Sequence, residues 1–513
     1  MPGSPHRRPR PFLLLGVLMA GLLTDTASLA ATSIPAASSR SGLAAQIDAV
    51  IDQPRFAHAG WGIAVVSLDS GRTLYTHRAD RLGQPASIAK LFTAAVSLAT
   101  LGPDYRFPTR LLSRGAIRHG RLDGQLILYG MGDPTLGTAD SSDWAEQLAS
   151  QLHARGIRQV HGDLIADDSY FSGPSFGTGW EAGDLQSWFA VPTSALSVNE
   201  NVVDVTLTPG ASAGLPASLL LAPTDGIPNT LGRIETTRSP TPSDINLYRA
   251  PGADTLYLFG SMPARSPPAH FRLAMADPAL QAARQLRAAL ARHGIRVSGS
   301  TGVLHWPLDD RALLADTHVL GELQSPPLQE ILKRGLKRSQ NLYLQNLLLS
   351  VGVREQATTT APPTTFLDSE GWGIRALRGL LTGIGIAPEV SRIAEGTGLS
   401  RQDLVTPDAM VRLLVYLAAQ PYAAQLREAL PLAGVDGTLT YRMRGTAAAG
   451  NVQAKTGSMR YVHSMAGYVT TASGERLAFV IMLDNYRSPA GAPPASRELD
   501  AIAVLLSNEE GND

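Results

Sequence analysis

Hydrophobic residues follow one pattern near both ends of the chain and another pattern in the middle. Apolar runs over residues 62–68 and 73–75 flank the turn sequence Asp-Ser-Gly and predict a β-hairpin. Runs over 462–469 and 477–483 predict a second hairpin near the C-terminus. Apolar residues at helical spacing predict helices over six further segments: 41–51, 87–101, 327–351, 371–385, 406–419 and 495–506.

The segment from about residue 105 to 315 has many short strand-like runs separated by turn residues, and few long helical patterns. This texture predicts an α/β (α+β) fold in which one domain is interrupted by a long β-rich insertion of one or two domains. We predict the boundaries as residues 31–105 and 316–506 for the interrupted domain, 106–315 for the insertion and 507–513 for a tail.

A secretory signal peptide is predicted over residues 1–30. A basic segment at 6–10 precedes an apolar segment at 12–23, and small residues then place a cleavage site after or near Ala30. A membrane anchor is the alternative, but this apolar segment is too short to span a bilayer comfortably. We therefore expect the mature protein outside the cytoplasm, without stable membrane insertion.

The composition excludes several classes of function. The net charge is zero, so nothing indicates a nucleic-acid partner. The chain has no cysteine, which excludes disulfides, thiol nucleophiles and cysteine-ligated zinc. It also lacks the His-Glu-x-x-His spacing of many zinc peptidases. We expect neither a metal nor a cofactor.

Lysine is scarce, because only four of the 44 basic residues are lysine. Two of the four lie in short motifs, Ser87-Ile-Ala-Lys90 and Lys455-Thr-Gly. A desolvated lysine can lose its proton, whereas an arginine stays charged at any accessible pH. A lysine that must act as a base cannot be replaced by arginine, so these motifs are candidates for proton-transfer chemistry.

Ser87 and Lys90 are the candidate nucleophile and base. Residues three apart on a helix share one face, so a helix that begins at Ser87 places its hydroxyl beside the Lys90 ammonium. A neutral Lys90 can remove the serine proton, and the serine then attacks a carbonyl carbon. The alternative is that Ser87 only caps the helix.

Ser339-Gln340-Asn341 is the second candidate element. The hydroxyl of Ser339 could pass a proton to a leaving group. The amide of Asn341 could hold both a substrate amide and the Lys90 ammonium. The alternative is that both side chains are ordinary polar groups of a loop or a helix end.

Lys455-Thr456-Gly457-Ser458 is the third element, and we expect it on an edge strand just before the second hairpin. Lys455 and Thr456 could bind a substrate carboxylate, and Gly457 would let a backbone approach closely. The N–H of Ser458, together with that of Ser87, could form an oxyanion hole. The alternative is a solvated lysine where a strand begins.

The three elements occur in the order S-x-x-K, S-x-N and K-T-G, which β-lactamases and penicillin-binding proteins share. With them, nearly all of the mature chain resembles the D-alanyl-D-alanine carboxypeptidase/endopeptidase family of class C low-molecular-mass penicillin-binding proteins, peptidase family S13. The stretches that carry the resemblance beyond the motifs are Gly130–Leu136, Asp167–Phe171, Ala190–Asn201, Gly396–Pro407, Leu432–Leu439 and Ala448–Val469.

This resemblance implies a β-lactamase/transpeptidase-like serine-acyltransferase domain, with further domains inserted between the first and second motifs. It implies a periplasmic, serine-type D-alanyl-D-alanine carboxypeptidase/DD-endopeptidase that acts on peptidoglycan stem peptides through an acyl-enzyme on Ser87. Penicillins and other β-lactams would acylate the same serine. The oligomeric state and the balance of carboxypeptidase and endopeptidase action stay open.

The resemblance also implies further substrate contacts. Arg401 falls where the family has an arginine that lines the cleft, although a surface ion pair is the alternative. Asp167 and Phe171 fall near the place where the insertion contacts the third residue of the stem peptide, although Asp167 could be a turn residue. One departure is Gln340, where the family commonly has Asp, but this position carries none of the roles assigned above.

Two other functions stay open. A serine β-lactamase needs fast deacylation, and the Glu-x-x-Leu-Asn stretch that serves this step in class A enzymes is absent. A weakly active wall-binding scaffold is the second alternative, and the complete set of motifs argues against it.

Overall fold

The computed structural model describes residues 42–511. The predicted signal peptide, residues 31–41 and the last two residues of the predicted tail lie outside this range. Between residues 42 and 511, no helix is both long enough and apolar enough to cross a membrane.

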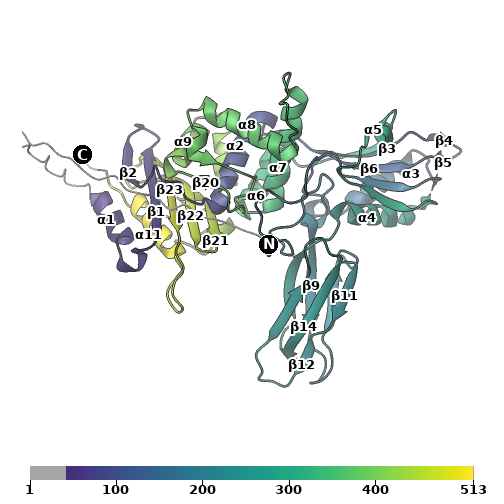
Figure 1. The fold of residues 1–513 in the computed structure, drawn as a ribbon, viewed down its shortest axis with the longest axis horizontal. Coiled ribbons are helices and arrows are strands. Elements are labelled where there is room, and N and C mark those ends of the chain that lie inside the picture. The colour runs from purple at the N-terminus through teal and green to yellow at the C-terminus, as the bar shows by residue number, and fades with distance from the viewer. Residues whose placement is uncertain (1–41, 512–513) are drawn as a thin grey trace, which may run out of the picture. The chain divides into compact units, whose positions relative to one another are not determined.

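One antiparallel sheet joins the two ends of the chain, in the strand order β2-β1-β23-β22-β21 (Figure 1). Both predicted hairpins are confirmed, and β1 pairs with β23 along its whole length, so the hairpins lie side by side. The sequence motif around Lys455 lies on β21, which is an edge strand as expected. The strands are β1 (Gly60–Ser67), β2 (Thr73–His77), β21 (Gln453–Met459), β22 (Val462–Thr470) and β23 (Arg476–Asp484).

Both faces of this sheet are buried, so β23 is apolar without interruption from Leu477 to Leu483. Alternate side chains of a strand point to opposite faces. Phe479 and Ile481 therefore pack into one hydrophobic core together with residues of α1 (Gly42–Ile51) and α11 (Ser496–Ser507). Ala478 and Val480 pack into a second core, which contains α2, α7 and α9.

Helix α7 packs against three helices of this second face, α2, α6 and α8, and is buried on all sides from Asn341 to Gly352. A helix that is apolar around its whole circumference belongs in a core. The helices are α2 (Lys90–Leu101), α6 (Leu328–Lys337), α7 (Asn341–Thr358), α8 (Ser369–Gly383), α9 (Pro407–Ala418) and α10 (Ala423–Ala429). A short strand pair, β19 (Ser391–Arg392) and β20 (Leu404–Val405), lies between α8 and α9 in the sequence.

The helical character predicted over residues 327–351 is confirmed, but as two helices with a break between them. Helix α6 ends at Lys337 and α7 begins at Asn341, and between them Ser339 has a left-handed backbone with φ 57°. A non-glycine residue in this region cannot continue a right-handed helix. The break falls within the second motif, so Ser339 and Gln340 lie in the turn between the two helices.

The middle of the chain forms four sheets in the described structure. In Figure 1, β3, β4, β5 and β6 lie together, apart from β9, β11, β12 and β14. The five-stranded sheet has the order β17-β8-β6-β3-β18, and its strands are β3 (Pro108–Ser113), β6 (Leu126–Gly130), β8 (Leu164–Asp167), β17 (Thr301–Leu304) and β18 (His318–Gln324). A small sheet contains β4 (Ala116–Arg118), β5 (Arg121–Asp123), β7 (Gln159–Val160) and β16 (Arg296–Val297). The other two sheets contain β9 (Val202–Thr208), β10 (Ser218–Ala222) and β15 (Ala269–Ala274), and β11 (Asn229–Gly232), β12 (Glu235–Thr237), β13 (Asp244–Tyr248) and β14 (Thr255–Pro263).

Three helices in this middle region were not predicted: α3 (Trp144–Ala154), α4 (Pro278–Arg292) and the short α5 (Arg311–Leu314). The start of α4 carries a recognisable signal. The Asp277 carboxylate accepts a hydrogen bond from the Leu280 N–H at 2.9 Å, and Pro278 occupies the first turn. The many short strand-like runs around it obscured this signal.

Helices α7 and α8 cross at two glycines, which provides a test of the packing. A Cβ added to Gly352 would overlap the Ser369 carbonyl oxygen and lie 2.8 Å from the Gly373 nitrogen. We expect Gly352→Ala to lower the free energy of unfolding by about 1–3 kcal/mol, because two backbones must move apart. Gly379→Ala on α8 is the control, since its Cβ would enter open space and should stabilise the helix by about 0.5–1 kcal/mol. Urea unfolding measures both changes, and equal stabilities would contradict the packing.

Candidate active site

Ser87 lies on a 3-10 turn, Ala86–Ala89, that leads directly into α2. The turn places the Ser87 hydroxyl 2.8 Å from the Lys90 ammonium nitrogen. Ala86, just before Ser87, has a left-handed φ of 47°, so the chain enters the turn sharply. The Ser87 side chain caps neither the turn nor the helix. The geometry therefore favours the nucleophile over the helix cap.

The Lys90 side chain is fully buried and surrounded by oxygen atoms. Besides Ser87, its ammonium donates to Asn341 Oδ1 at 2.6 Å and to the Thr397 carbonyl at 2.7 Å. Burial lowers the pKa of Lys90 to about 7, although the negative charges of Glu395 and Asp403 oppose this shift. A large fraction of Lys90 is therefore neutral near neutral pH, as a general base requires.

The helix break between α6 and α7 brings the second motif to the same place. Asn341 is the first residue of α7, and its amide nitrogen donates to the Phe189 carbonyl at 2.6 Å. Its oxygen is thereby turned toward Lys90. Ser339, two residues earlier, accepts a hydrogen bond from the Lys455 ammonium at 2.9 Å. The second motif thus contacts both lysines, one through each polar side chain.

Lys455 on β21 is also fully buried. Its partners are the Ser339 hydroxyl and the Thr456 carbonyl, at 2.9 and 2.7 Å, and both are uncharged. Burial lowers the pKa of Lys455 well below its usual value, and repulsion from Lys90 adds to the shift. This repulsion disappears when Lys90 is neutral. The pKa values of the two buried lysines are therefore linked through the repulsion between their charges.

Gly457 allows β21 to pass directly beside the turn that carries Ser87. A Cβ at this position would lie 2.9 Å from the Ser87 nitrogen and 2.8 Å from the Pro85 carbonyl, and would overlap the Ser464 hydroxyl. Ser464 is buried and donates to that same Pro85 carbonyl at 2.6 Å. Only glycine permits this contact between β21 and the backbone of the nucleophile.

A cleft of about 720 Å³ opens over these residues. Six residues that the sequence singled out line it: Ser87, Ser339, Asn341, Arg401, Thr456 and Ser458. Lys90 and Lys455 lie beneath its floor, each joined to one of the lining serines. The Thr456 hydroxyl is 2.7 Å from that of Thr438, so two hydroxyls stand together at one wall.

Arg401 both lines the cleft and contacts its neighbours. Its guanidinium donates to Gln84 Oε1 at 2.9 Å and to the Arg460 carbonyl at 3.1 Å, and it lies 3.4 Å from Glu181. Arg401 is therefore both a cleft residue and a partner in an ion pair, so the two interpretations are compatible.

The structure does not bring Asp167 and Phe171 to the cleft. Asp167 is buried at the end of β8, where one oxygen accepts from the Ser169 N–H and hydroxyl at 3.0 and 2.7 Å. Burial raises the pKa of this carboxyl to about 6. Phe171 packs against Ala195 and Leu349 in a small hydrophobic cluster. Both side chains are buried, and neither lines this cleft, so the expected contact with the third residue of the stem peptide stays a prediction.

The acidic residues that do line the cleft are Glu181 and Asp184, which the sequence analysis missed. They lie in a segment without regular structure, which also supplies Trp188 and Phe189 to the cleft. Burial and the neighbouring Glu181 raise the pKa of Asp184, while Arg401 and Arg460 oppose this shift. Such loop residues leave no periodic pattern in a sequence, so only the resemblance of neighbouring stretches could have suggested this region.

Glu395 supports the floor of the cleft and was also missed. Its buried carboxylate accepts hydrogen bonds from the backbone N–H groups of Thr397, Gly398 and Leu399 at 2.8, 2.6 and 3.0 Å. This fixes the loop whose Thr397 carbonyl binds Lys90. Burial, and next the charge of Glu395, raise the pKa of the buried Asp403 well above its usual value.

A serine beside a buried lysine, a second serine beside another buried lysine, and an asparagine between them define a serine acyl-transfer enzyme of the penicillin-recognising type. The chain belongs to the D-Ala-D-Ala carboxypeptidase 3 (S13) family, whose model matches residues 43–508. The resemblance seen in the sequence is thereby confirmed, as is the expectation of a hydrolase from a serine peptidase family.

Named relatives and solved structures agree with this assignment. The chain is 34% identical to a D-alanyl-D-alanine carboxypeptidase of Actinomadura sp. (strain R39), over 91% of this chain and 84% of the relative. It is 30% identical to the D-alanyl-D-alanine carboxypeptidase DacB of Haemophilus influenzae, over 78% and 80% of the two chains. The crystal structure of penicillin binding protein 4 from H. influenzae matches with a TM-score of 0.76 and 27% identity, covering 89% of this chain and 97% of that one. A second structure of that protein contains a β-lactam and matches with a TM-score of 0.73.

The state of Lys90 yields a testable pH dependence. Neutral Lys90 is the form that accepts a proton, and its pKa is about 7. We therefore expect the rate constant for acylation by a penicillin to rise about tenfold per pH unit below the pKa and to level off above it. Stopped-flow measurement with a chromogenic or fluorescent penicillin gives this profile.

Lys90→Arg is the matched variant, because guanidinium keeps its proton throughout. It should remove the rising limb and slow acylation by about 10²–10⁴-fold. Lys333→Arg, on the surface of α6, is the control and should leave the rate unchanged. Acylation that does not vary with pH would contradict the role of Lys90.

Proposed function

We propose that the protein is a serine-type D-alanyl-D-alanine carboxypeptidase and DD-endopeptidase that acts on peptidoglycan stem peptides and is acylated by β-lactams. The observation that carries this proposal is the position of Lys90, 2.8 Å from Ser87 Oγ and 2.6 Å from Asn341 Oδ1 on the floor of an open cleft. The activities named for the relatives support the choice of substrate.

In the proposed reaction, Ser87 Oγ attacks the carbonyl carbon of the penultimate D-alanine, and neutral Lys90 takes the serine proton. The carbonyl oxygen becomes an oxyanion, held by the backbone N–H groups of Ser87 and Ser458. The C–N bond then breaks as Ser339 Oγ gives a proton to the leaving nitrogen. The proton that Lys90 took is passed on to Ser339 Oγ, so Lys90 is neutral and Ser339 is protonated again before the second half of the reaction. The products of this step are free D-alanine, or the amine of a cross-linked strand, and an ester on Ser87.

The second half of the reaction restores the enzyme. Water attacks the ester carbonyl, Lys90 accepts the water proton, and the bond to Ser87 Oγ breaks with return of a proton to that oxygen. Lys455 and Thr456 bind the terminal carboxylate of the substrate before the first step. This assignment is supported by the uncharged partners of Lys455, since a bound carboxylate would supply the counter-charge that they lack and would favour the ammonium form.

We further propose that Glu181, Asp184 and Arg401 bind the third residue of the stem peptide, in place of Asp167 and Phe171. Acidic and basic groups stand together at this end of the cleft, and Arg460 adds a second cation. A side chain that ends in both an ammonium and a carboxylate would find a partner for each charge there.

The proposal also covers where the protein is located. Residues 1–30 would direct the chain out of the cytoplasm, to the compartment where peptidoglycan is found.

The insertion would be an independent folding unit, because the hydrophobic core of its sheets contains only residues between Leu111 and Leu320. It would extend beyond residue 315 to Gln324, since β18 pairs with β3.

Digestion of purified peptidoglycan tests the function. The wild-type protein should release D-alanine from monomeric stem peptides and convert cross-linked dimers to monomers, both visible by chromatography with mass spectrometry. Ser87→Ala should abolish both reactions and covalent labelling by penicillin, because the ester cannot form. The penicilloyl-enzyme should persist well beyond one catalytic cycle. Hydrolysis of penicillin within seconds would instead favour a β-lactamase, and sacculus binding without any cleavage would favour a scaffold.

A second test separates the two proposed sites for the third residue. Asp184→Asn should lower kcat/KM about tenfold for peptides whose third side chain carries an ammonium, because one interaction with that charge is lost. The same variant should leave peptides with an uncharged third side chain unaffected. Asp167→Asn, away from the cleft, should leave kcat/KM unchanged for both. The reverse pattern would return the assignment to Asp167.

A further inference from the structure

The three residues Asn199–Asn201 form a short 3-10 turn directly before strand β9 and have an unusual backbone. Asn199, Glu200 and Asn201 have left-handed φ values of 53°, 55° and 55°. Such a conformation is uncommon for any residue except glycine, and a glutamate has less reason than asparagine to adopt it. A strained segment persists only where its surroundings determine it, and such segments concentrate at functional sites.

The two asparagines hold this turn from both sides. Asn201 accepts from the Val198 N–H at 2.9 Å and donates to the Pro192 carbonyl at 2.8 Å. Asn199 donates to the Gly137 carbonyl at 3.0 Å. These contacts direct the side chain of the residue between them, Glu200, outward from the turn.

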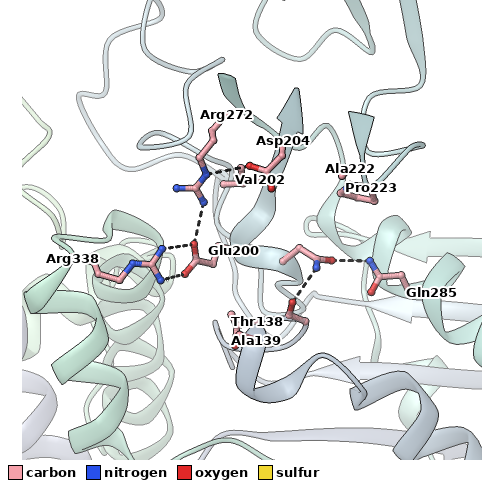
Figure 2. Close-up of a pocket in the computed structure, with 12 residues that line it drawn as sticks. Thr138, Ala139, Glu200, Val202, Asp204, Ala222, Pro223, Arg272, Gln285 and Arg338 are labelled. Atoms are coloured by element: carbon pink, nitrogen blue, oxygen red, sulfur yellow. Dashed lines mark hydrogen bonds and ion pairs between the residues drawn. The ribbon is translucent and has the colours of Figure 1, made fainter. Parts of the chain in front are cut away.

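The Glu200 carboxylate is largely buried and is surrounded by donors from the second motif. Arg338 Nη1 and Nη2 donate to its two oxygens at 2.8 and 3.1 Å, and Gln340 Nε2 donates at 2.9 Å. Tyr343 OH and Arg272 Nη2 add contacts at 3.3 and 3.2 Å. Figure 2 shows Glu200 between the guanidinium groups of Arg338 and Arg272.

Arg338 and Gln340 are the two chain neighbours of Ser339. One carboxylate therefore binds the residue before and the residue after Ser339, which itself has a left-handed φ of 57°. We propose that Glu200 is a positioning residue that holds this turn, so that Ser339 Oγ meets Lys455 and Asn341 Oδ1 meets Lys90. The inference rests on the proposed function, because it concerns the proton that Ser339 gives to the leaving nitrogen.

The identity of residue 340 agrees with this role. The Gln340 side chain is buried and its amide donates to Glu200. An aspartate at this position would present a second carboxylate to Glu200, with no proton to donate at neutral pH. Gln340, the departure from the usual family residue, is therefore matched to the carboxylate that it binds.

The network is open to solvent on one side, where it borders a pocket of about 450 Å³. Asp204 lies on the same side, 3.4 Å from Arg272, and is mostly exposed. It is an acid in the same pocket, and its ion pair is with Arg272 alone. Asp204→Asn is therefore a matched control for Glu200→Gln.

The test uses two substrates that differ only in the leaving group: a peptide that releases D-alanine, and the corresponding thioester that releases a thiolate. A leaving amine needs the proton from Ser339, whereas a thiolate leaves without one. Glu200→Gln should lower kcat roughly 10- to 100-fold for the peptide and much less for the thioester, with little change in KM. Ser339→Ala should show the same dependence on the leaving group, and Asp204→Asn should behave as the wild type.

A purely structural role would lower the thermal stability of Glu200→Gln and reduce both activities by the same factor, and that result would overturn the inference. If Glu200→Gln does not fold, Gln340→Ala repeats the test, because it removes a single donor and leaves the carboxylate bound to both arginines. Equal losses on the two substrates would again overturn it. A wild-type protein that cleaves neither substrate would overturn the proposed function and this inference with it.

Discussion

The burial of two lysine side chains beside each other is the constraint on which the site depends. Neither Lys90 nor Lys455 is accessible to solvent, and the charge of Lys90 lowers the pKa of Lys455. Two cations cannot both remain charged in such a place at low cost. Each lysine is instead surrounded by neutral oxygens, which stabilise a proton without holding it permanently. In the proposed reaction, one of these lysines is the base and the other binds the substrate carboxylate.

Two buried carboxylates support this site, and among the described contacts neither is bonded to Lys90 or Lys455. Glu395 holds the loop that supplies the Thr397 carbonyl, and Glu200 holds the turn that carries Ser339. A carboxylate in direct contact with Lys90 would raise its pKa and remove its function as a base. The two acids instead bind backbone N–H groups, guanidinium groups and an amide. These contacts fix the shape of the two loops without placing a carboxylate in contact with Lys90.

Local patterns predicted the regular elements well where both partners of an interaction are close in the sequence. The two hairpins and the helices before β1 and after β23 follow from alternation, helical spacing and turn residues. The pattern predicted helical structure over residues 327–351 but not the break within it, which lies beside a distant carboxylate, Glu200. It failed for α4, whose signal was obscured by strand-like neighbours. The substrate contact expected of Asp167 stays a prediction, since a resemblance between short stretches does not tell whether a side chain faces the cleft or the core.

The sequence by itself determined the chemistry that this protein can perform. The order of the three motifs, the choice of lysine where arginine is otherwise used, and the family all follow from the order of the residues. Only the tertiary structure decided the pKa values of those groups and which residues surround them. The lowered pKa of Lys90 arises from burial by segments hundreds of residues apart, and the charges at the far end of the cleft come from a loop without periodicity. Desolvation and loop position depend on the whole fold, whereas residue identity and spacing are local.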